Sequence, residues 1–173
     1  RKAWDHPSLG SANYRLADHD DTTGIGVYSF CMCPGGYVLS SGTEPDGVVA
    51  NGMSNFNRNS PFANAAIVIS IDHTKRFGKD LFGGLKFRRE LETAAYQSVQ
   101  NALAKGLRPT GGDTATSGRQ AIPVQRVTDF LSGRGGPALR SSSPSGVVPV
   151  RLDQLLPSDL TMRMRESLER FNQ

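Results

Sequence analysis

Short hydrophobic runs recur through the first half of the chain, and turn-forming residues separate them. The runs cover residues 12–17, 25–32, 37–43, 47–54 and 64–72. Runs of this length that are rich in β-branched and aromatic residues and bounded by Gly, Pro, Asn or Asp are typical of β-strands. We therefore predict that residues 12–72 are mainly strands, and that 64–72, the most apolar run, is a buried central strand.

A Pro-Gly-Gly turn, residues 34–36, separates the second and third runs. Two strands joined by such a short turn commonly pair as a hairpin. With the regular spacing of the other runs, this predicts an antiparallel sheet or a small barrel. The acidic segment 18–21 is predicted to be a surface loop and not an acid–base pair.

The second half of the chain has helical spacing. Apolar residues fall on one face of a helix over 85–105, followed by Gly106 as a C-terminal cap; they are Phe87, Leu91, Ala94, Ala95, Val99, Ala102 and Leu103. Shorter helices are predicted at 124–131, after Pro123, at 152–157, and at 158–173, with Ser158 or Asp159 as its cap.

The remaining segments of the second half read as loops. Residues 110–120 are polar and rich in glycine, and 133–149 are rich in Gly, Ser and Pro, which predicts an exposed, flexible loop. We therefore expect an α+β fold, with strands in the first half and helices over 85–172. Residues 1–173 are expected to form a single domain.

Charge and composition narrow the class of protein. The net charge is +4, but Lys and Arg form no dense block, so a nucleic-acid partner is not favoured. No apolar run approaches the roughly 18 residues that a membrane-spanning helix needs. The first residues lack the apolar core of a secretory signal, and the chain has only two cysteines. We therefore expect a reduced, cytoplasmic protein without a membrane partner.

The two cysteines, Cys31 and Cys33, are the first candidates for chemistry. On a regular strand Ser29, Cys31 and Cys33 would line one face. A zinc site needs at least three protein ligands, and the three histidines of the chain show no ligand spacing, so no metal is predicted. A disulfide between residues so close together would be strained. The simplest interpretation is two small, half-buried strand residues.

Glycines and amides supply the other candidates. Gly35 and Gly36 either form a turn or let the backbone approach a partner closely. The chain contains neither GxGxxG nor GxxxxGK[ST], so it lacks the phosphate cradle of a dinucleotide-binding domain. Residues 48–66 hold five asparagines, which either orient a ligand at a strand end or occupy turn positions of a solvated loop.

Six segments together carry a family resemblance. They are YSFCMCPGGYV (28–38), VVANGMS (48–54), NAAIVIS (64–70), FRRELETAAY (87–96), PVQRVTDFL (123–131) and LDQLLP (152–157). In this order they resemble the uncharacterised FAD-dependent dehydrogenases, also called NAD(FAD)-utilising dehydrogenases, over residues 12–171. SFCMCPGG and NGMS are the specific motifs, whereas 110–120 and 133–149 look longer than the family pattern.

The resemblance implies a middle domain, inserted between two flavin-binding segments, that covers the flavin and shapes the substrate site. FAD would be present in the full-length protein but not tightly bound to this chain, which is expected to be inactive alone. The implied partners are the FAD-binding domain of the same polypeptide and a small-molecule substrate of unknown identity. NAD(P)H is a further candidate.

The resemblance also implies roles for residues near the two motifs. Cys31 and Cys33 are catalytic candidates. The residues expected to face the flavin are Cys33, Pro34, Gly35 and Gly36, and those expected to contact substrate are Asn51, Met53, Ser54, Arg58 and Asn64. The alternative function is a stand-alone binding module for an anionic ligand or RNA, in which Tyr28, Phe30 and Tyr37 would stack on bases.

Overall fold

The fold is described from a computed structural model that places residues 15–112, 120–138 and 140–172. Seven strands in this part of the chain form three small sheets, and five helices surround them. Antiparallel sheets in the first half and helices in the second confirm the α+β class. The placed strands do not close into a barrel, so that alternative is wrong. The predictions for residues 12–14 and 113–119 lie outside the described residues.

The first sheet is antiparallel and has the order β1-β2-β5. Its strands are β1 (Ala17–Asp20), β2 (Ile25–Cys33) and β5 (Asn64–Ile69). The central strand is β2, so the prediction of 64–72 as a buried central strand is wrong. Ala65 and Ala66 of β5 are exposed although the strand is apolar. Composition alone does not distinguish an edge strand with one uncovered face from a central one.

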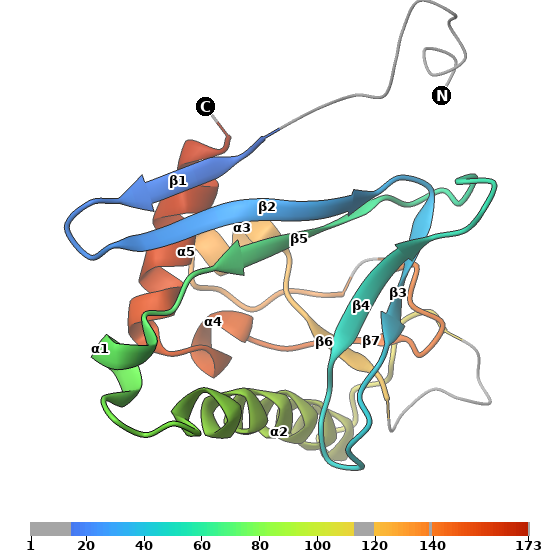
Figure 1. Cartoon of the computed structure of the whole chain (residues 1–173). Coiled ribbons are helices and arrows are strands. Elements are labelled where there is room, and N and C mark those ends of the chain that lie inside the picture. Colours follow the sequence, from blue (N-terminus) through green and yellow to red (C-terminus); the bar gives the residue numbers. More distant parts are fainter. Residues whose placement is uncertain (1–14, 113–119, 139, 173) are drawn as a thin grey trace, which may run out of the picture.

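The second sheet is the hairpin of β3 (Gly36–Ser40) and β4 (Ala50–Ser54). The predicted hairpin between 25–32 and 37–43 is therefore wrong, because β3 pairs with β4 and not with β2. The turn after β2 directs the chain out of the first sheet. Figure 1 shows the hairpin running from the end of β2 towards the opposite side of the molecule.

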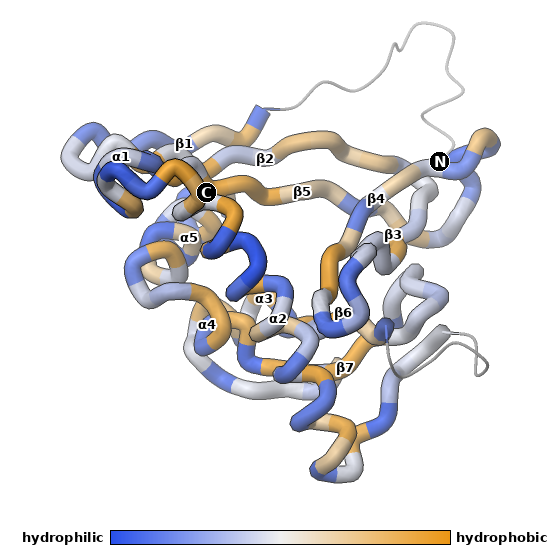
Figure 2. Tube along the Cα trace, turned by 60° about the horizontal axis from the view of Figure 1, so that its bottom comes forward, coloured by the Kyte–Doolittle hydropathy of each residue, from blue (hydrophilic) through white to orange (hydrophobic). Residues whose placement is uncertain are grey.

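The long helix α2 (Gly83–Ala104) confirms the 85–105 prediction and follows the short helix α1 (His73–Phe77). The core forms where its second half packs on a parallel pair of strands, with Val99, Ala121 and Val148 fully buried. These strands are β6 (Ile122–Val124) and β7 (Val147–Pro149). Hydrophobic residues run along β5 and β7 (Figure 2).

The parallel pair corrects two predictions. Pro123 lies within β6, so the helix expected over 124–131 begins later, as α3 (Val127–Leu131). The end of the segment 133–149 is not an exposed loop, because Val147 and Val148 are buried in β7. Strands of three residues carry too little periodicity to be recognised in a sequence.

Helix α5 (Ser158–Arg170) follows α4 (Leu152–Leu155), as the sequence predicts, and packs under the first sheet. Neither Ser158 nor Asp159 caps it; the cap position is Pro157, and Asp159 instead binds Arg76 at 2.7 Å.

A charged cluster fastens α5 to the first strand. The Asp18 carboxylate lies 2.8 Å from Arg163 Nη1 and accepts hydrogen bonds from Ser167 Oγ at 2.8 Å and Arg170 Nη1 at 2.7 Å. Burial raises the pKa of Asp18, but these three donors together outweigh it and lower the pKa from 3.8 to about 2. The prediction of 18–21 as a surface loop is therefore wrong for residues 18–20, which belong to β1, and Asp18 is half-buried.

This cluster predicts an acid-sensitive contribution to stability. Because the folded-state pKa of Asp18 is depressed, its contribution is present above pH 4 and is lost as the pH falls towards 2. Asp18→Asn should lower the free energy of unfolding at pH 7 by about 2 kcal/mol, since Arg163 loses its nearest counter-charge. Urea unfolding measured at neutral and acidic pH checks this. Asp21→Asn is the control, because Asp21 is fully exposed, and an equal loss in both variants would contradict the assignment.

Candidate functional site: the junction of the two antiparallel sheets

The predicted site residues meet where the two antiparallel sheets join. Cys33 pairs with Asn64 in the first sheet, and Gly36 pairs with Ser54 in the second. Asn64 Nδ2 donates a hydrogen bond to the Tyr37 carbonyl oxygen at 3.2 Å, which connects the sheets. We call this region the sheet junction and define it by Cys31, Cys33, Pro34, Gly35, Gly36, Gly52, Met53, Ser54, Arg58 and Asn64. The SFCMCPGG and NGMS motifs are thus brought together in space.

Three glycines make the close packing of the sheet junction possible. A Cβ atom on Gly36 would lie 2.2 Å from the Met53 carbonyl oxygen, and one on Gly52 would lie 2.0 Å from Asn64 Oδ1. Gly35 has a φ of +55°, and its Cβ would lie 1.8 Å from the Arg58 carbonyl oxygen. Both interpretations of the glycine pair therefore apply, a turn and a close approach, and the close approach is to this chain's own backbone. Their contact with a flavin stays a prediction.

Several of the predicted substrate residues are used inside the junction. Ser54 Oγ donates to the Pro34 carbonyl oxygen at 3.0 Å, and Asn64 is held as described above. In the asparagine-rich segment, Asn55 Nδ2 donates to Asn59 Oδ1 at 2.9 Å. These bonds favour the turn interpretation for that part of the segment.

The other predicted substrate residues remain accessible. Asn51 lies opposite Leu39 on β4 and is exposed, and Met53, opposite Tyr37, is 43% exposed. Arg58 is also exposed. These three side chains are free to meet a ligand or another part of the protein.

Cys31 lies in a β-bulge. Phe30 pairs with Ala66 and Met32 with Ala65, so Cys31 is an extra residue without a partner in β5. The expectation that Ser29, Cys31 and Cys33 line one face is therefore wrong, because a bulge interrupts the alternation of the strand. Cys31 is exposed and Cys33 is half-buried, and both are free thiols.

Backbone strain is concentrated at the junction. Cys31 has a φ of 39° and Arg58 a φ of 46°, and no other described residue except glycine has a positive φ. Such conformations typically cost about 1–3 kcal/mol and persist where the surrounding structure holds them. Strained residues and bulges gather at functional sites more than elsewhere, which supports the junction as the candidate site.

An uncovered apolar surface adjoins the junction on the first sheet. Val27 is fully buried on the side of α5, so its neighbours in β2 point the opposite way, and Tyr28 is 43% and Phe30 57% exposed. The register places further apolar residues beside them. We call this surface the open sheet face and define it by Ala17, Tyr28, Phe30, Ala66 and Val68.

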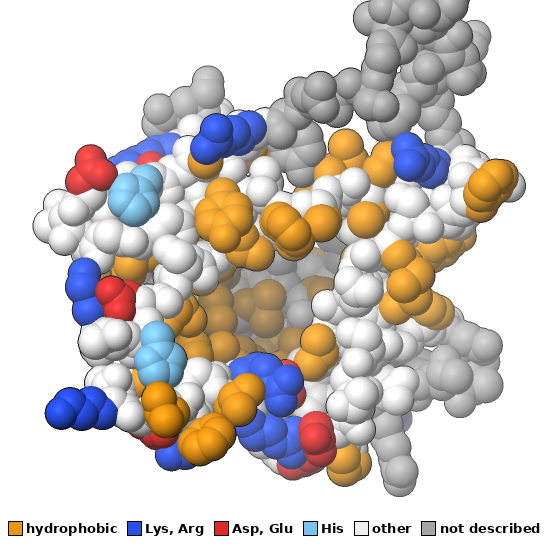
Figure 3. All heavy atoms as spheres, in the orientation of Figure 1, with side chains coloured by type: hydrophobic (Ala, Val, Ile, Leu, Met, Phe, Trp, Pro, Cys, Tyr) orange, Lys and Arg blue, Asp and Glu red, His pale blue; other side chains and the backbone are white. Residues whose placement is uncertain are grey.

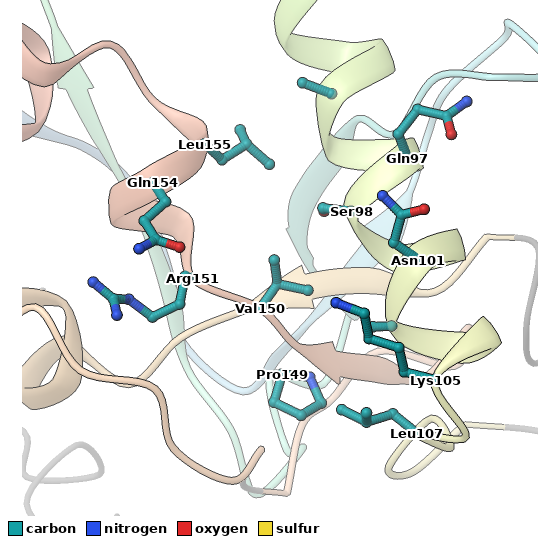
Figure 4. A pocket seen from close by; sticks show the side chains of 12 residues that line it. Gln97, Ser98, Asn101, Lys105, Leu107, Pro149, Val150, Arg151, Gln154 and Leu155 are labelled. Atoms are coloured by element: carbon teal, nitrogen blue, oxygen red, sulfur yellow. The ribbon is translucent and has the colours of Figure 1, made fainter.

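The surface of the domain is hollowed in several places. Figure 3 shows a deep hollow bordered by β5, α2 and the β3–β4 hairpin, with hydrophobic side chains on its floor. Another, of about 600 Å³, lies between α2 and α4, where Gln97, Asn101 and Lys105 face Gln154 across Val150 (Figure 4). Arg151 on its edge is held by two hydrogen bonds to Asp153, and this contact lowers the pKa of Asp153.

A third hollow, of about 670 Å³, adjoins the junction and is lined in part by Phe62, Arg126 and Arg140. No sequence pattern marked these residues as part of a site. They belong to three separate segments, and no local motif relates them. Their only signal was the position of Phe62 within the asparagine-rich segment 48–66.

The described residues offer neither a metal cluster nor a membrane-spanning helix. Within the placed part of the chain, no group of three or more His, Cys, Asp or Glu residues could hold a metal ion. No helix among the same residues is long and apolar enough to cross a membrane.

Comparisons with known proteins identify relatives. The profile of a family described as "FAD-dependent protein, C-terminal domain-like" matches residues 1–173. An uncharacterized protein of Clostridium beijerinckii is 32% identical over 170 residues, which cover 96% of this chain and 29% of that protein. The chain therefore spans less than a third of the length of this relative. Neither match supports the alternative of a stand-alone binding module for an anionic ligand or RNA.

The glycine contacts predict how the junction responds to substitution. Gly36→Ala should lower the free energy of unfolding by at least about 2 kcal/mol, because the methyl group meets the Met53 carbonyl oxygen on a fixed backbone. Gly84→Ala is the control, since a Cβ there has no neighbour closer than 4.0 Å and alanine favours the helix by about 0.5 kcal/mol. Denaturant unfolding of both variants measures the difference, and similar values would show that the junction is not tightly packed.

Proposed function

Because this chain belongs to the C-terminal domain-like family of FAD-dependent proteins, we propose that it is the substrate-binding or cap domain of an FAD-dependent oxidoreductase. The chain itself has no dinucleotide-binding GxGxxG motif. FAD would be held by another part of a longer polypeptide, in keeping with the length of the relative. When bound, the flavin supplies the redox chemistry, and the protein supplies orientation and electrostatics. The dehydrogenase class, the use of NAD(P)H and the inserted position of the domain belong to the same proposal.

The observation that carries the proposal is the open sheet face beside the strained junction. An apolar sheet surface with two exposed aromatic side chains, Tyr28 and Phe30, is typical of an interaction site. Its small neighbours, Ala17 and Ala66, leave the faces of these two aromatic side chains accessible to a partner surface. The partner we propose is the FAD-binding part of the same polypeptide.

The positions of the junction residues suggest their roles in such an arrangement. Cys31 is exposed directly after Phe30, so it would lie at the contact with the flavin-binding part. Of the residues assigned to the substrate, Asn51, Met53 and Arg58 are free to contact it. Ser54 and Asn64 hold the backbone of the junction and would act as positioning residues. The half-buried Cys33 pairs with Asn64 and would be shielded from reagents.

The proposal predicts where flavin is found. The full-length protein should purify with the absorbance spectrum of a bound flavin, whereas the 173-residue chain should purify without it, because its phosphate-binding elements are elsewhere. Absorbance spectroscopy before and after addition of FAD measures both. A full-length protein that remains colourless and does not take up added FAD would overturn the proposal.

The rate at which Cys31 is alkylated can report whether the open sheet face is covered in the full-length protein. The test uses full-length protein carrying Cys33→Ser, with and without Phe30→Asp. A charge in an apolar interface should separate this domain from the FAD-binding part. We therefore expect iodoacetamide to alkylate Cys31 about tenfold more slowly without Phe30→Asp than with it. Mass spectrometry follows the reaction. Phe56→Asp is the matched control, because Phe56 is exposed on a loop outside the open sheet face. Equal rates in all three proteins would show that this face is not covered.

A further inference from the structure

The hollow beside the sheet junction has the size of a small-molecule site. Its volume is about 670 Å³, within the usual range for such sites. It is adjacent to the junction, because the Gly36 amide donates a hydrogen bond to the carbonyl oxygen of Phe62, a lining residue, at 2.9 Å. The lining includes Phe62, Gln125, Arg126, Arg140, Ser141 and Ser142.

The lining carries positive charge. It includes two arginines and no carboxylate. Arg126 Nε donates to Asp129 Oδ2 at 2.7 Å, so the charge of this guanidinium is largely balanced. Arg140 makes no hydrogen bond or ion pair with any residue that the structure places. One guanidinium at the hollow is therefore available, and its planar set of donors matches the two oxygens of a carboxylate.

The available side-chain polar groups are hydrogen-bond donors. Ser142 Oγ accepts from the Val38 amide at 3.1 Å and Ser141 Oγ accepts from the Ser143 amide at 3.1 Å, and each hydroxyl still has a proton to donate. Gln125 is already satisfied. Its Nε2 donates to the Arg134 carbonyl at 2.9 Å and to Asp153 Oδ1 at 2.8 Å, and its Oε1 accepts from the Asp153 amide at 3.1 Å.

The apolar part of the lining defines the rest of the ligand. Most lining residues are apolar, with Phe62 the largest. A small inorganic anion would leave these walls in contact with water, whereas an organic body would cover them. Donors and a cation at one part of the lining, together with apolar walls elsewhere, suit an amphipathic anion.

We propose that this hollow binds an organic carboxylate that has an apolar body, with Arg140 as the residue that recognises the carboxylate. The inference rests on the proposed function and extends it, because it names the chemical class of the substrate. Ser141 and Ser142 complete the set of donors, and Phe62 contacts the apolar body. Arg126 stays paired with Asp129 and contributes its hydrocarbon stem and part of its charge.

The test uses benzoate and benzamide, which have similar shapes and differ in charge. In calorimetric titrations of the full-length protein at low salt, benzoate should bind at least about tenfold more tightly than benzamide, as expected for a hydrogen-bonded charge pair. Arg140→Gln should reduce benzoate affinity by about tenfold and leave benzamide binding unchanged. Arg134→Gln is the matched control from the same region, because Arg134 does not line the hollow. Circular dichroism verifies that each variant is folded.

Three results would overturn the inference: absence of benzoate binding at millimolar concentration, equal affinity for the two probes, or an unchanged benzoate affinity in Arg140→Gln. The flavin spectrum reports on the proposed function separately. A yellow protein that does not bind benzoate contradicts the carboxylate site and leaves the flavin role intact. A colourless protein that prefers benzoate, in a manner that depends on Arg140, contradicts the flavin role and leaves the site intact.

Discussion

The architecture depends on close packing of the Asn64 side chain of one antiparallel sheet against the backbone of another sheet with which it shares no strand. Gly36 and Gly52 have no side chains, so β4 and the Asn64 amide can lie against them, and the Asn64 hydrogen bond to Tyr37 then fixes the distance between the sheets. The direction of the β3–β4 hairpin follows from this contact, and so does the space enclosed by the hairpin, β5 and α2 (Figure 3).

The domain joins two regions of different character. The parallel pair β6–β7 and the second half of α2 form a conventional hydrophobic core around Val99 and Val148. The first sheet is instead held to α5 by Asp18, Arg163 and Arg170, and its other side is left uncovered. A sheet with a charged attachment on one side and exposed aromatic residues on the other is suited to lie between two parts of a larger protein.

The sequence predicted elements better than it predicted their pairing. The helices α2 and α5 were found because apolar residues repeat over several turns, and β2 and β5 because they are rich in β-branched residues. The acidic strand β1 was instead expected to be a loop. The exit of the chain at Pro34 and the pairing of β6 with β7 depend on contacts between distant residues. The bulge at Cys31 has no local signature, so the expected common face of the two cysteines was wrong.

In the candidate site, too, local motifs were recognised from the sequence and the contacts between them were not. Resemblance to a family connected the SFCMCPGG and NGMS motifs, and the structure brings them together. The resemblance could not show that Ser54 and Asn64 hold the junction from inside, because their hydrogen-bond partners are backbone carbonyls that no motif specifies. Arg140 was missed because it belongs to a segment, 133–149, that the composition describes only as a loop.

The attachment of β1 to α5 has a consequence for the synthesis of the protein. Asp18 is among the first described residues, and Arg163, Ser167 and Arg170 are among the last, so the two ends of the domain are bonded to each other. During translation the first sheet leaves the ribosome well before the residues that neutralise Asp18 exist. The antiparallel strands can pair early, but the sheet acquires its supporting helix only when nearly the whole domain has been made. A ribosome that stalls before α5 would therefore present an incompletely supported sheet, a natural target for chaperones.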